Sequence, residues 1–315
     1  MEKNDLRDGL AVIIGASSLD VVGRLQKTLR LGTSNPSIIR TSFGGVARNV
    51  AENLARLGQP VVLLSVVGKD RIGDDLIAHT EQAGVDVSSI HRTDAFPTSF
   101  YMGVLEQDGS RKFAFDDMRI STQLSEAYIT YNEDVFNQAS LIFIDANVPE
   151  ETLRRVIEIA RYCDIPVCAD PTSVVLSPHL FPYLKDIHIL VPNALEASAL
   201  IKKKFDPNDV EKASAAARQL VAMGVEEVFL SIGDKGICYA SSETSGHIPG
   251  ILTQVIDPTG AGDAVTAAVL FAHLNDIPLD DAARLAISAA TITVRHQGTV
   301  DPNISLQLLY DELST

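Results

Sequence analysis

The sequence predicts an α/β protein built on a mainly parallel sheet, with a small β lid beside it. Apolar runs recur along the chain, and helical patterns lie between them. Strands that are apolar throughout are typical of parallel sheets covered by helices on both faces. Regular alternation of strand and helix is most simply satisfied by βαβ units. Two segments with a period of two interrupt this alternation, and we expect them to form the lid.

The expected strands and helices follow from these patterns. Glycine commonly closes a helix, and Gly58 and Gly84 each follow a helical pattern. We expect strands at 11–17, 61–68, 141–146, 165–170, 188–192 and 225–233. We expect helices at 46–58, 71–84, 149–163 and 206–224.

The two interrupting segments, 21–43 and 96–118, contain the short alternating stretches of antiparallel strands. Within the second segment, "QDGS" at 107–110 indicates a hairpin turn. Both segments follow early strands, where a lid over the carboxyl edge of the sheet is expected to emerge. Since no linker or repeat divides the sequence, we expect residues 1–315 to form a single domain.

Charge and composition exclude several classes of function. The formal net charge of −15 disfavours binding to nucleic acid or to anionic membranes. No apolar run approaches the roughly 20 residues that cross a bilayer, and we expect a cytoplasmic protein. The sequence has neither a P-loop nor a GxGxxG dinucleotide motif, and its histidines show no metal-ligand spacing. A phosphate would be held locally, by backbone amides and a metal ion.

The stretch "DPTGAGDAVTAAVL" at 257–270 predicts an anion site at the start of a helix. Gly260 and Gly262 allow close backbone approach, and the small apolar residues after them suit a closely packed helix. Free N–H groups and the macrodipole at a helix start favour negative charge. Asp263 either complements this dipole or serves as the base that accepts a proton from an attacking hydroxyl. We expect the dipole to lower the pKa of Asp263 and make it a weak base.

A second glycine pair precedes the helix expected at 46–58. Gly44 and Gly45 in "SFGGVARNVAENLARLG" leave room for a substrate beside the backbone. Asn49 is either an incidental polar residue of this helix or a donor to substrate hydroxyls. Asp20, which follows the first strand, is either a turn acid or the acceptor for two sugar hydroxyls.

Two further motifs follow later strands. In "PNALEA" at 192–197, Asn193 and Glu196 form either a helix capping box or a set of oxygen ligands for hydrated Mg²⁺. "SIGDKG" at 231–236 is either a tight turn or a backbone surface on which a nucleotide lies.

Taken in order, "GGVARN", "PNALE", "SIGDKG", "DPTGAGD" and "VRHQG" resemble the signatures of the ribokinase-like (PfkB) sugar kinase family over nearly the whole chain. The match of "DPTGAGDAV" to the C-terminal signature of the family is highly specific, and "GGVARN" resembles its N-terminal signature, whereas the other three motifs gain weight mainly from their order. The resemblance implies a three-layer αβα fold with a β lid. It also implies transfer of the γ-phosphoryl group of ATP to a sugar or nucleoside hydroxyl, with Mg²⁺ and K⁺ as cofactors. Exposed lid edges favour a homodimer formed through the lid.

The resemblance also assigns roles to individual residues. Asp263 is the base, and the anion hole is formed by Gly260, Ala261 and Gly262. Residues expected near ATP and Mg²⁺ are Asn193 and Glu196, which act through water, and Ser231, Gly233 and Gly236. Residues expected to hold the hydroxyl substrate are Asp20, Gly44, Gly45 and Asn49. The monovalent cation is expected around Asp257, Thr259 and Gly298.

Departures from the family pattern narrow the choice of substrate. Val46 stands where ribokinases usually have a lysine, which disfavours ribose. "SNPSIIRTSFGGVARNVAENLARLG" and "FAFDDMRIS" resemble family members that phosphorylate the 5′-hydroxyl of pseudouridine. Asp116 or Asp117, with Asp117 preferred, then contacts this nucleoside unless it is simply solvated. The alternatives are kinases of ribose, fructose, adenosine or inosine, and a ligand-binding regulator without activity, against which the intact Asp263 argues.

Overall fold

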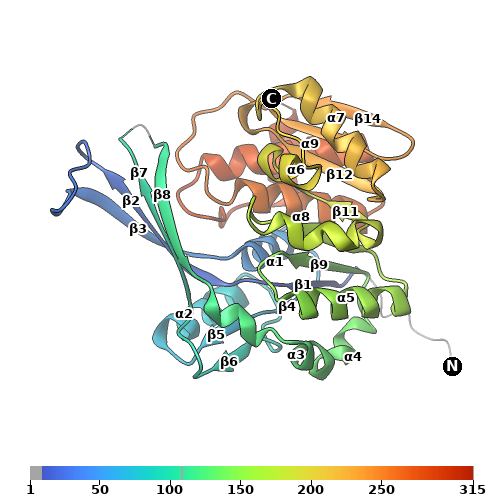
Figure 1. Cartoon of the computed structure of the whole chain (residues 1–315), viewed down its shortest axis with the longest axis horizontal. Helices are drawn as coiled ribbons and strands as arrows, with labels where there is room; N and C mark the ends of the chain where they lie inside the picture. Colours follow the sequence, from blue (N-terminus) through green and yellow to red (C-terminus); the bar gives the residue numbers. More distant parts are fainter. Residues whose placement is uncertain (1–8, 108, 315) are drawn as a thin grey trace.

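The structure, a computed structural model, describes residues 9–107 and 109–314 and has three layers with a lid beside them (Figure 1). The middle layer is an eight-stranded sheet. In spatial order its strands are β14 (Ser245–Ile248), β13 (Ile237–Ala240), β12 (Glu227–Ser231), β11 (Ile189–Leu190), β10 (Val167–Asp170), β9 (Leu141–Asp145), β1 (Ala11–Ile14) and β4 (Val61–Leu64). The strands from β12 to β4 are parallel, while β13 and β14 extend one edge in antiparallel fashion. The predicted fold class is confirmed.

Helices cover both faces of this sheet (Figure 1). One face is covered by α1 (Val46–Arg56), α2 (Arg71–Gln82), α8 (Ala261–Leu274), α9 (Leu279–Val294) and α10 (Leu306–Leu313). The other face is covered by α3 (Glu126–Tyr131), α4 (Glu133–Phe136), α5 (Glu150–Cys163), α6 (Ala194–Leu200), α7 (Val210–Ala222) and the 3₁₀ helices η1 (Arg119–Gln123) and η2 (Ser177–Asp186). No helix of the described residues combines the length and the hydropathy that a bilayer crossing requires.

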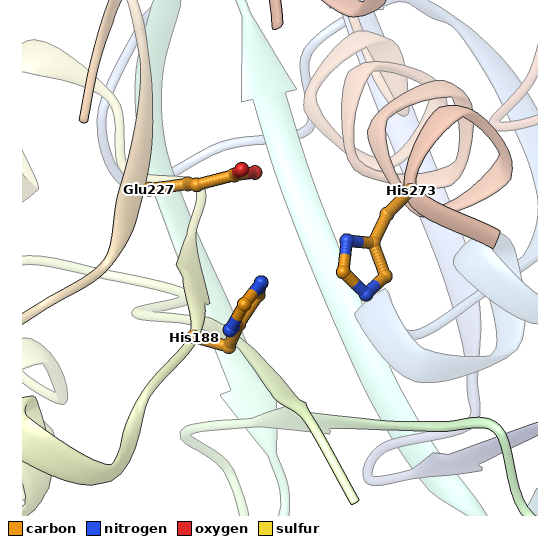
Figure 2. Close-up of side chains that lie close together, drawn as sticks. All are labelled: His188, Glu227 and His273. Carbon is orange, nitrogen blue, oxygen red and sulfur yellow. The ribbon is translucent and has the colours of Figure 1, made fainter. Parts of the chain in front are cut away.

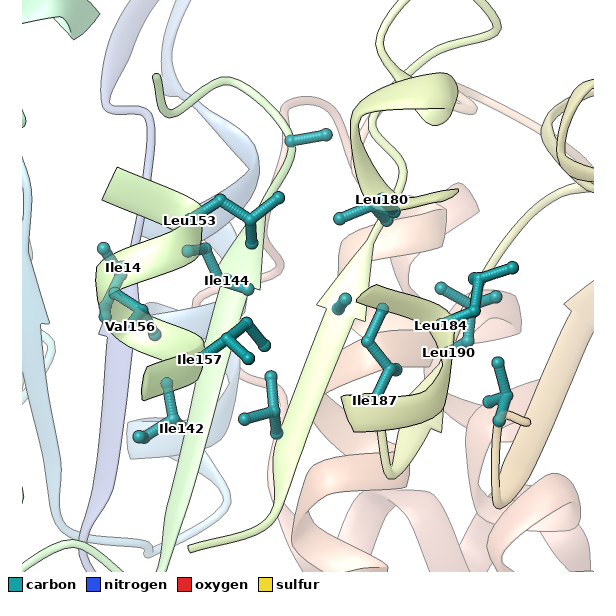
Figure 3. Packing of buried hydrophobic residues seen from close by; sticks show 14 of the residues in the cluster. Ile14, Ile142, Ile144, Leu153, Val156, Ile157, Leu180, Leu184, Ile187 and Leu190 are labelled. Carbon is teal, nitrogen blue, oxygen red and sulfur yellow. The ribbon is translucent and has the colours of Figure 1, made fainter. Parts of the chain in front are cut away.

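Alternate side chains of each central strand enter two separate cores. In β1, Ile13 packs with the face that carries α8, and Ile14 packs with the face that carries α5. This alternation follows from the period of two in a strand. Figure 3 shows the second core, where Ile14 and Ile144 of the sheet meet Val156 of α5. Strands buried on both faces explain why the sequence shows unbroken apolar runs.

The lid is a four-stranded sheet that projects from the body of the molecule (Figure 1). Its strands, in spatial order, are β3 (Ser37–Gly44), β2 (Ser18–Leu25), β7 (Ser99–Leu105) and β8 (Arg111–Asp117). They lie in and beside the two segments that interrupt the alternation. Strands β7 and β8 pair in antiparallel fashion, as the predicted hairpin requires, although residue 108 of its turn lies outside the described residues. A further pair, β5 (Val66–Gly68) and β6 (His91–Thr93), lies apart from both sheets.

Helix α8 runs along the parallel strands of the central sheet, from near their carboxyl ends to near their amino ends. Its middle, Ala264 to Ala272, is buried and consists largely of small side chains. Near its first turn, Thr266 lies beside Asp170 at the carboxyl end of β10. Near its last turn, His273 lies beside His188, which immediately precedes β11. One end of α8 therefore lies at the carboxyl ends of the parallel strands, and the other end lies at their amino ends.

Candidate active site

Asp263 lies in the first turn of α8, where it meets Asn49 of α1. Asn49 Nδ2 donates a hydrogen bond to Asp263 Oδ2 over 2.5 Å. The two residues are far apart in the sequence, and the packing of α1 against α8 brings them together. The structure thus joins two side chains that the sequence placed in separate motifs.

Burial raises the pKa of Asp263 to about 7. The hydrogen bond from Asn49 opposes this rise, and the nearby charge of Asp20 adds to it. The expectation that the helix dipole lowers this pKa is wrong, because a helix end contributes less than removal of a carboxylate from water. A carboxylate with a pKa near 7 is a better general base at neutral pH than an ordinary aspartate.

Arg48, which the sequence did not single out, holds Asn49 in place. Its guanidinium is buried and donates to Asn49 Oδ1. It also donates to the carbonyl oxygens of Gly44 and Phe43 over 3.0 and 2.9 Å, and to Glu52 Oε2 over 2.5 Å. Because the amide oxygen of Asn49 faces Arg48, its NH₂ group faces Asp263. The arginine within "GGVARN" was the signal for this role.

The glycines of the two motifs are required by close backbone contacts. A Cβ atom on Gly44 would lie 2.2 Å from the carboxylate of Asp20, and one on Gly260 would lie 1.9 Å from the carbonyl oxygen of Thr299. Gly45, with a φ of 93°, is the N-cap of α1. The glycines therefore allow the lid and the start of α8 to pack closely against their neighbours.

The start of α8 also leaves space for an anion. Gly260 is its N-cap, with a φ of 82°. Nothing lies within 4 Å of a Cβ atom placed on Gly262, so open space adjoins this residue. The amide of Ala261 donates to the carbonyl oxygen of Pro258 over a long 3.4 Å. The predicted anion hole therefore has room at Gly262, while the amide of Ala261 is partly engaged within the turn.

Buried carboxylates from neighbouring strands gather near Asp263. Asp145 ends β9 and accepts from the amides of Ala16 and Ala47 over 2.9 and 3.1 Å. Asp170 ends β10, and its pKa is raised by burial and by the charges of Glu196 and Asp263. Both aspartates stand in stretches that the sequence analysis assigned to strands, and it missed them. Acids at the carboxyl ends of parallel strands were the signal.

Asn193 and Glu196 form the capping box that the sequence offered as one alternative. Asn193 Oδ1 accepts from the Glu196 amide over 3.0 Å, and Glu196 Oε2 accepts from the Asn193 amide over 2.9 Å. Glu196 is nevertheless buried beside Asp170, and burial raises its pKa. Oxygen donors of this kind are the ligands that Mg²⁺ prefers. The group of Asp170 and Glu196 therefore fits a magnesium ion in addition to its structural role.

The third motif adjoins the capping box. Ser231 ends β12 and forms a parallel bridge with Asn193. Open space lies beside Gly233, since no atom is within 4 Å of a Cβ atom placed there. Gly236 has a packing role, because its Cβ atom would lie 2.0 Å from the carbonyl oxygen of Ile248, and its predicted contact with ATP stays a prediction. Of the two glycines, Gly233 is the better placed to border a nucleotide.

The lid presents a row of polar side chains on the face that carries Asp20. Asp20 pairs in register with Ser42 on one side and with Tyr101 on the other, and Tyr101 pairs with Asp116. Residues paired in register point to the same face of a sheet. Asp117 therefore points to the opposite face, and it forms an ion pair with Arg119. The contact predicted for Asp117 stays a prediction, and the register favours Asp116.

Asp20 itself lies within lid strand β2, so the alternative that it is a turn acid is wrong. It is buried and accepts from the Ser18 hydroxyl over 2.7 Å. Burial raises its pKa, and the hydrogen bond from Ser18 partly offsets this effect. Its position on a strand, beside Gly44, holds its carboxylate at the root of the lid.

Asp257, Thr259 and Gly298 line one cavity between the lid and the start of α8. The cavity has a volume of about 250 Å³ and is also lined by Arg40 and Ser42 of the lid. The guanidinium of Arg40 disfavours a further cation nearby. The predicted monovalent cation at this place stays a prediction.

Comparison with known proteins agrees with this arrangement. The family model described as pfkB family carbohydrate kinase matches residues 9–306. The pseudouridine kinase of Escherichia coli strain K12 is 34% identical over 297 residues, which cover 94% of this chain and 93% of that protein.

Solved structures share the fold. A carbohydrate kinase from Agrobacterium tumefaciens is 26% identical, has a TM-score of 0.82 and aligns over 97% of both chains. An E. coli protein assigned as a ribokinase II, in complex with ATP and Mg²⁺, is 19% identical with a TM-score of 0.82 over 98% of this chain and 99% of that one. The chain belongs to the pfkB family of carbohydrate kinases, enzymes that transfer a phosphoryl group to a sugar hydroxyl.

Proposed function

We propose that this kinase transfers the γ-phosphoryl group of ATP to the 5′-hydroxyl of pseudouridine, with Asp263 as the general base. The observation that carries the proposal is the contact between Asp263 and Asn49 at the glycine-opened start of α8. In the proposed site, this contact would hold the base in place before substrate binds. The choice of pseudouridine is supported by the 34% identity to the E. coli pseudouridine kinase.

In the proposed mechanism, Asp263 accepts the proton of the attacking hydroxyl. Burial holds its pKa at about 7, so the carboxylate and the carboxylic acid are both populated near neutral pH. Asn49 fixes the orientation of the carboxylate. Phosphoryl transfer depends mainly on positioning and on stabilisation of charge, so a base of moderate strength is sufficient.

The start of α8 is proposed to hold the transferred phosphoryl group. The amides of Gly260, Ala261 and Gly262 and the helix dipole favour negative charge there. Mg²⁺, when bound, would neutralise charge on the phosphates of ATP. Glu196 and Asp170 are the buried carboxylates that fit this ion, with Asn193 beside them. Ser231 and Gly233 would border the nucleotide.

Asp20 and the lid are proposed to recognise the nucleoside. Asp20 and Asn49 lie at the root of the lid, where they can bind ribose hydroxyls. Tyr101 and Asp116 extend the same row of side chains outward, toward the position that a base would occupy. A base at this position would lie within reach of side chains that a free sugar does not extend to, which supports a nucleoside over ribose.

The proposal is tested by turnover of purified enzyme with pseudouridine, uridine, ribose, fructose and adenosine. Uridine is the matched control, because it differs from pseudouridine only in the atom that links base and sugar. The highest kcat/KM is expected for pseudouridine, and 5′-deoxypseudouridine is expected to be inert. Faster turnover of ribose, fructose or adenosine would contradict the proposal that pseudouridine is the substrate, but it would leave the assignment as a kinase intact.

We also propose that two copies of the chain associate through the lid. The lid face opposite Asp20 carries exposed apolar side chains, and their positions in the register place them together: Ile39, Met102, Phe113 and Phe115. Exposed apolar patches of this kind commonly mark protein interfaces. Light scattering should give the mass of a dimer for the wild type and of a monomer for Phe115→Glu. A monomeric wild type would contradict the proposal.

A further inference from the structure

Three side chains that share no sequence motif lie close together at the amino ends of the parallel strands, whereas the active site lies at their carboxyl ends. They are His188, which immediately precedes β11, Glu227, the first residue of β12, and His273 in the last turn of α8. One ligand atom of each lies within 4.8 Å of the corresponding atoms of the other two. Figure 2 shows both imidazole rings and the carboxylate pointing toward a common space.

The backbone fixes two of these residues relative to each other. The amide of Glu227 donates to the carbonyl oxygen of His188 over 2.8 Å, and the amide of His188 donates to the carbonyl oxygen of Val167 over 2.9 Å. Both residues therefore start adjacent strands of a rigid sheet. His273 is held across from them by the buried body of α8.

A neighbouring carboxylate also orients His188. Its Nδ1 lies 2.8 Å from Glu226 Oε2. A hydrogen bond at Nδ1 leaves Nε2 as the ring atom that can bind a metal ion. A carboxylate that orients a histidine in this way is the usual second layer of a metal site.

The position of His273 in the last turn of α8 also favours a metal ion. The carboxyl end of α8 carries the negative end of the helix dipole, which favours a positive ion. The rings of His188 and His273 lie edge to face, with centroids 4.9 Å apart.

We propose that His188, Glu227 and His273 bind one late first-row divalent cation, of which Zn²⁺ is the representative. Two imidazoles and one carboxylate, with a fourth position for water, form a common zinc ligand set. Bond lengths of about 2.0–2.1 Å place tetrahedral ligands about 3.3 Å apart, so side-chain rotations must close the present separations by up to about 1.5 Å. All three side chains are only half-buried and can make these rotations.

The ion would connect the end of α8 to the starts of β11 and β12. His273 is ten positions from Asp263 on this helix, which corresponds to about 15 Å along its axis. The ion would therefore stabilise the seat of the catalytic helix without contacting the substrate. This inference does not depend on which substrate the kinase phosphorylates.

The test measures binding of Zn²⁺ to the full chain by competition with a chromogenic chelator, in excess Mg²⁺ to occupy the oxygen-rich site. One Zn²⁺ per chain is expected for the wild type. Glu226→Gln should weaken the affinity by about 10-fold to 100-fold, and His273→Gln or Glu227→Gln should weaken it further. The exposed His179→Gln and Glu243→Gln are the matched controls and should bind as the wild type does.

A second measurement keeps the inference testable if a variant does not fold. Co²⁺ added to the wild type should give the intense visible absorption of a four-coordinate site with nitrogen ligands, and Zn²⁺ should abolish it. Zn²⁺ should also raise the Tm of the wild type and not that of His273→Gln. Unsaturable Zn²⁺ binding, a purely octahedral Co²⁺ spectrum, or equal affinity in wild type and His273→Gln would each overturn the proposal.

Discussion

At both ends of helix α8, burial shifts the pKa of a side chain. The two side chains differ, and so does the chemistry that each end can support. At the start, burial raises the pKa of Asp263 to about 7, and at the end, burial lowers the pKa of His273 to about 4. The helix dipole alone would favour an ionised acid at the start and a protonated base at the end. Burial therefore outweighs the dipole at both ends, and each shift favours the uncharged side chain.

This comparison shows what chemistry each end of α8 can support. An acid that is half protonated at neutral pH can accept a proton from a hydroxyl, and an imidazole that is not protonated can bind a metal ion. The start of the helix has backbone amides and glycines around it, whereas the end has a second histidine and a carboxylate. The following predictions test whether the two ends differ in this way.

The largest effect is expected for Asp263→Asn, which keeps the shape of the side chain but removes the base. The kcat should fall by about 10²-fold to 10⁴-fold, while substrate binding changes little. Steady-state kinetics with a separate binding measurement checks this. Asp276→Asn, at the other end of the same helix, is the control, since its φ of 53° is one that asparagine tolerates. Unchanged turnover in Asp263→Asn would show that Asp263 is not the general base.

Arg48→Lys should have the next largest effect. The charge that faces Glu52 is kept, but the fork of donors to Asn49, Gly44 and Phe43 is lost. Misplacement of Asn49 should lower kcat/KM by up to about 10²-fold. Unpaired buried carbonyl groups should lower the free energy of unfolding by about 1–3 kcal/mol. Kinetics and denaturant unfolding measure both, and the exposed Arg284→Lys serves as the control.

The pH dependence of the reaction should report the raised pKa of Asp263. Only the ionised carboxylate accepts the proton, so kcat/KM should fall about tenfold for each pH unit below about 7. The residual activity of Asp263→Asn should lack this acidic limb. A limb near pH 4 in the wild type would show instead that Asp263 titrates as an ordinary aspartate.

The smallest effect is expected at the far end of α8. His273→Gln should change kcat and KM by less than about twofold, because this residue lies about 15 Å along the helix from Asp263. Kinetics in excess Mg²⁺ with a chelator selective for Zn²⁺ checks this. A loss of activity comparable to that of Asp263→Asn would show that the two ends are not independent.

Much of the fold could be predicted, since it depends on local patterns. The helix expected at 46–58 is α1 at Val46–Arg56, and the run at 61–68 contains β4 and β5. The edge strands β13 and β14 and the helices α9 and α10 were not predicted. The short antiparallel hairpin at the edge follows directly after a tight turn, and the sequence analysis assigned this region to a turn only.

The site could be predicted only where a motif is continuous. Asp263 and Asn49 were found in separate motifs, but their contact depends on the packing of two helices. Asp145 and Asp170 were concealed at the ends of apolar strands, where the pattern of burial dominates the sequence. His188 and His273 come together through the topology of the sheet, which no spacing in the sequence encodes.

The lid has a consequence for protein engineering. Neighbouring residues on each of its strands point to opposite sides, so Tyr101 and Asp116 share one surface, and Met102 and Phe115 share the other. Under the proposed roles of the two lid faces, substitutions at positions 101 and 116 would alter acceptor preference without changing the apolar surface. Selection could then act on the proposed acceptor contacts and on the proposed self-association through separate sets of substitutions in the same four strands.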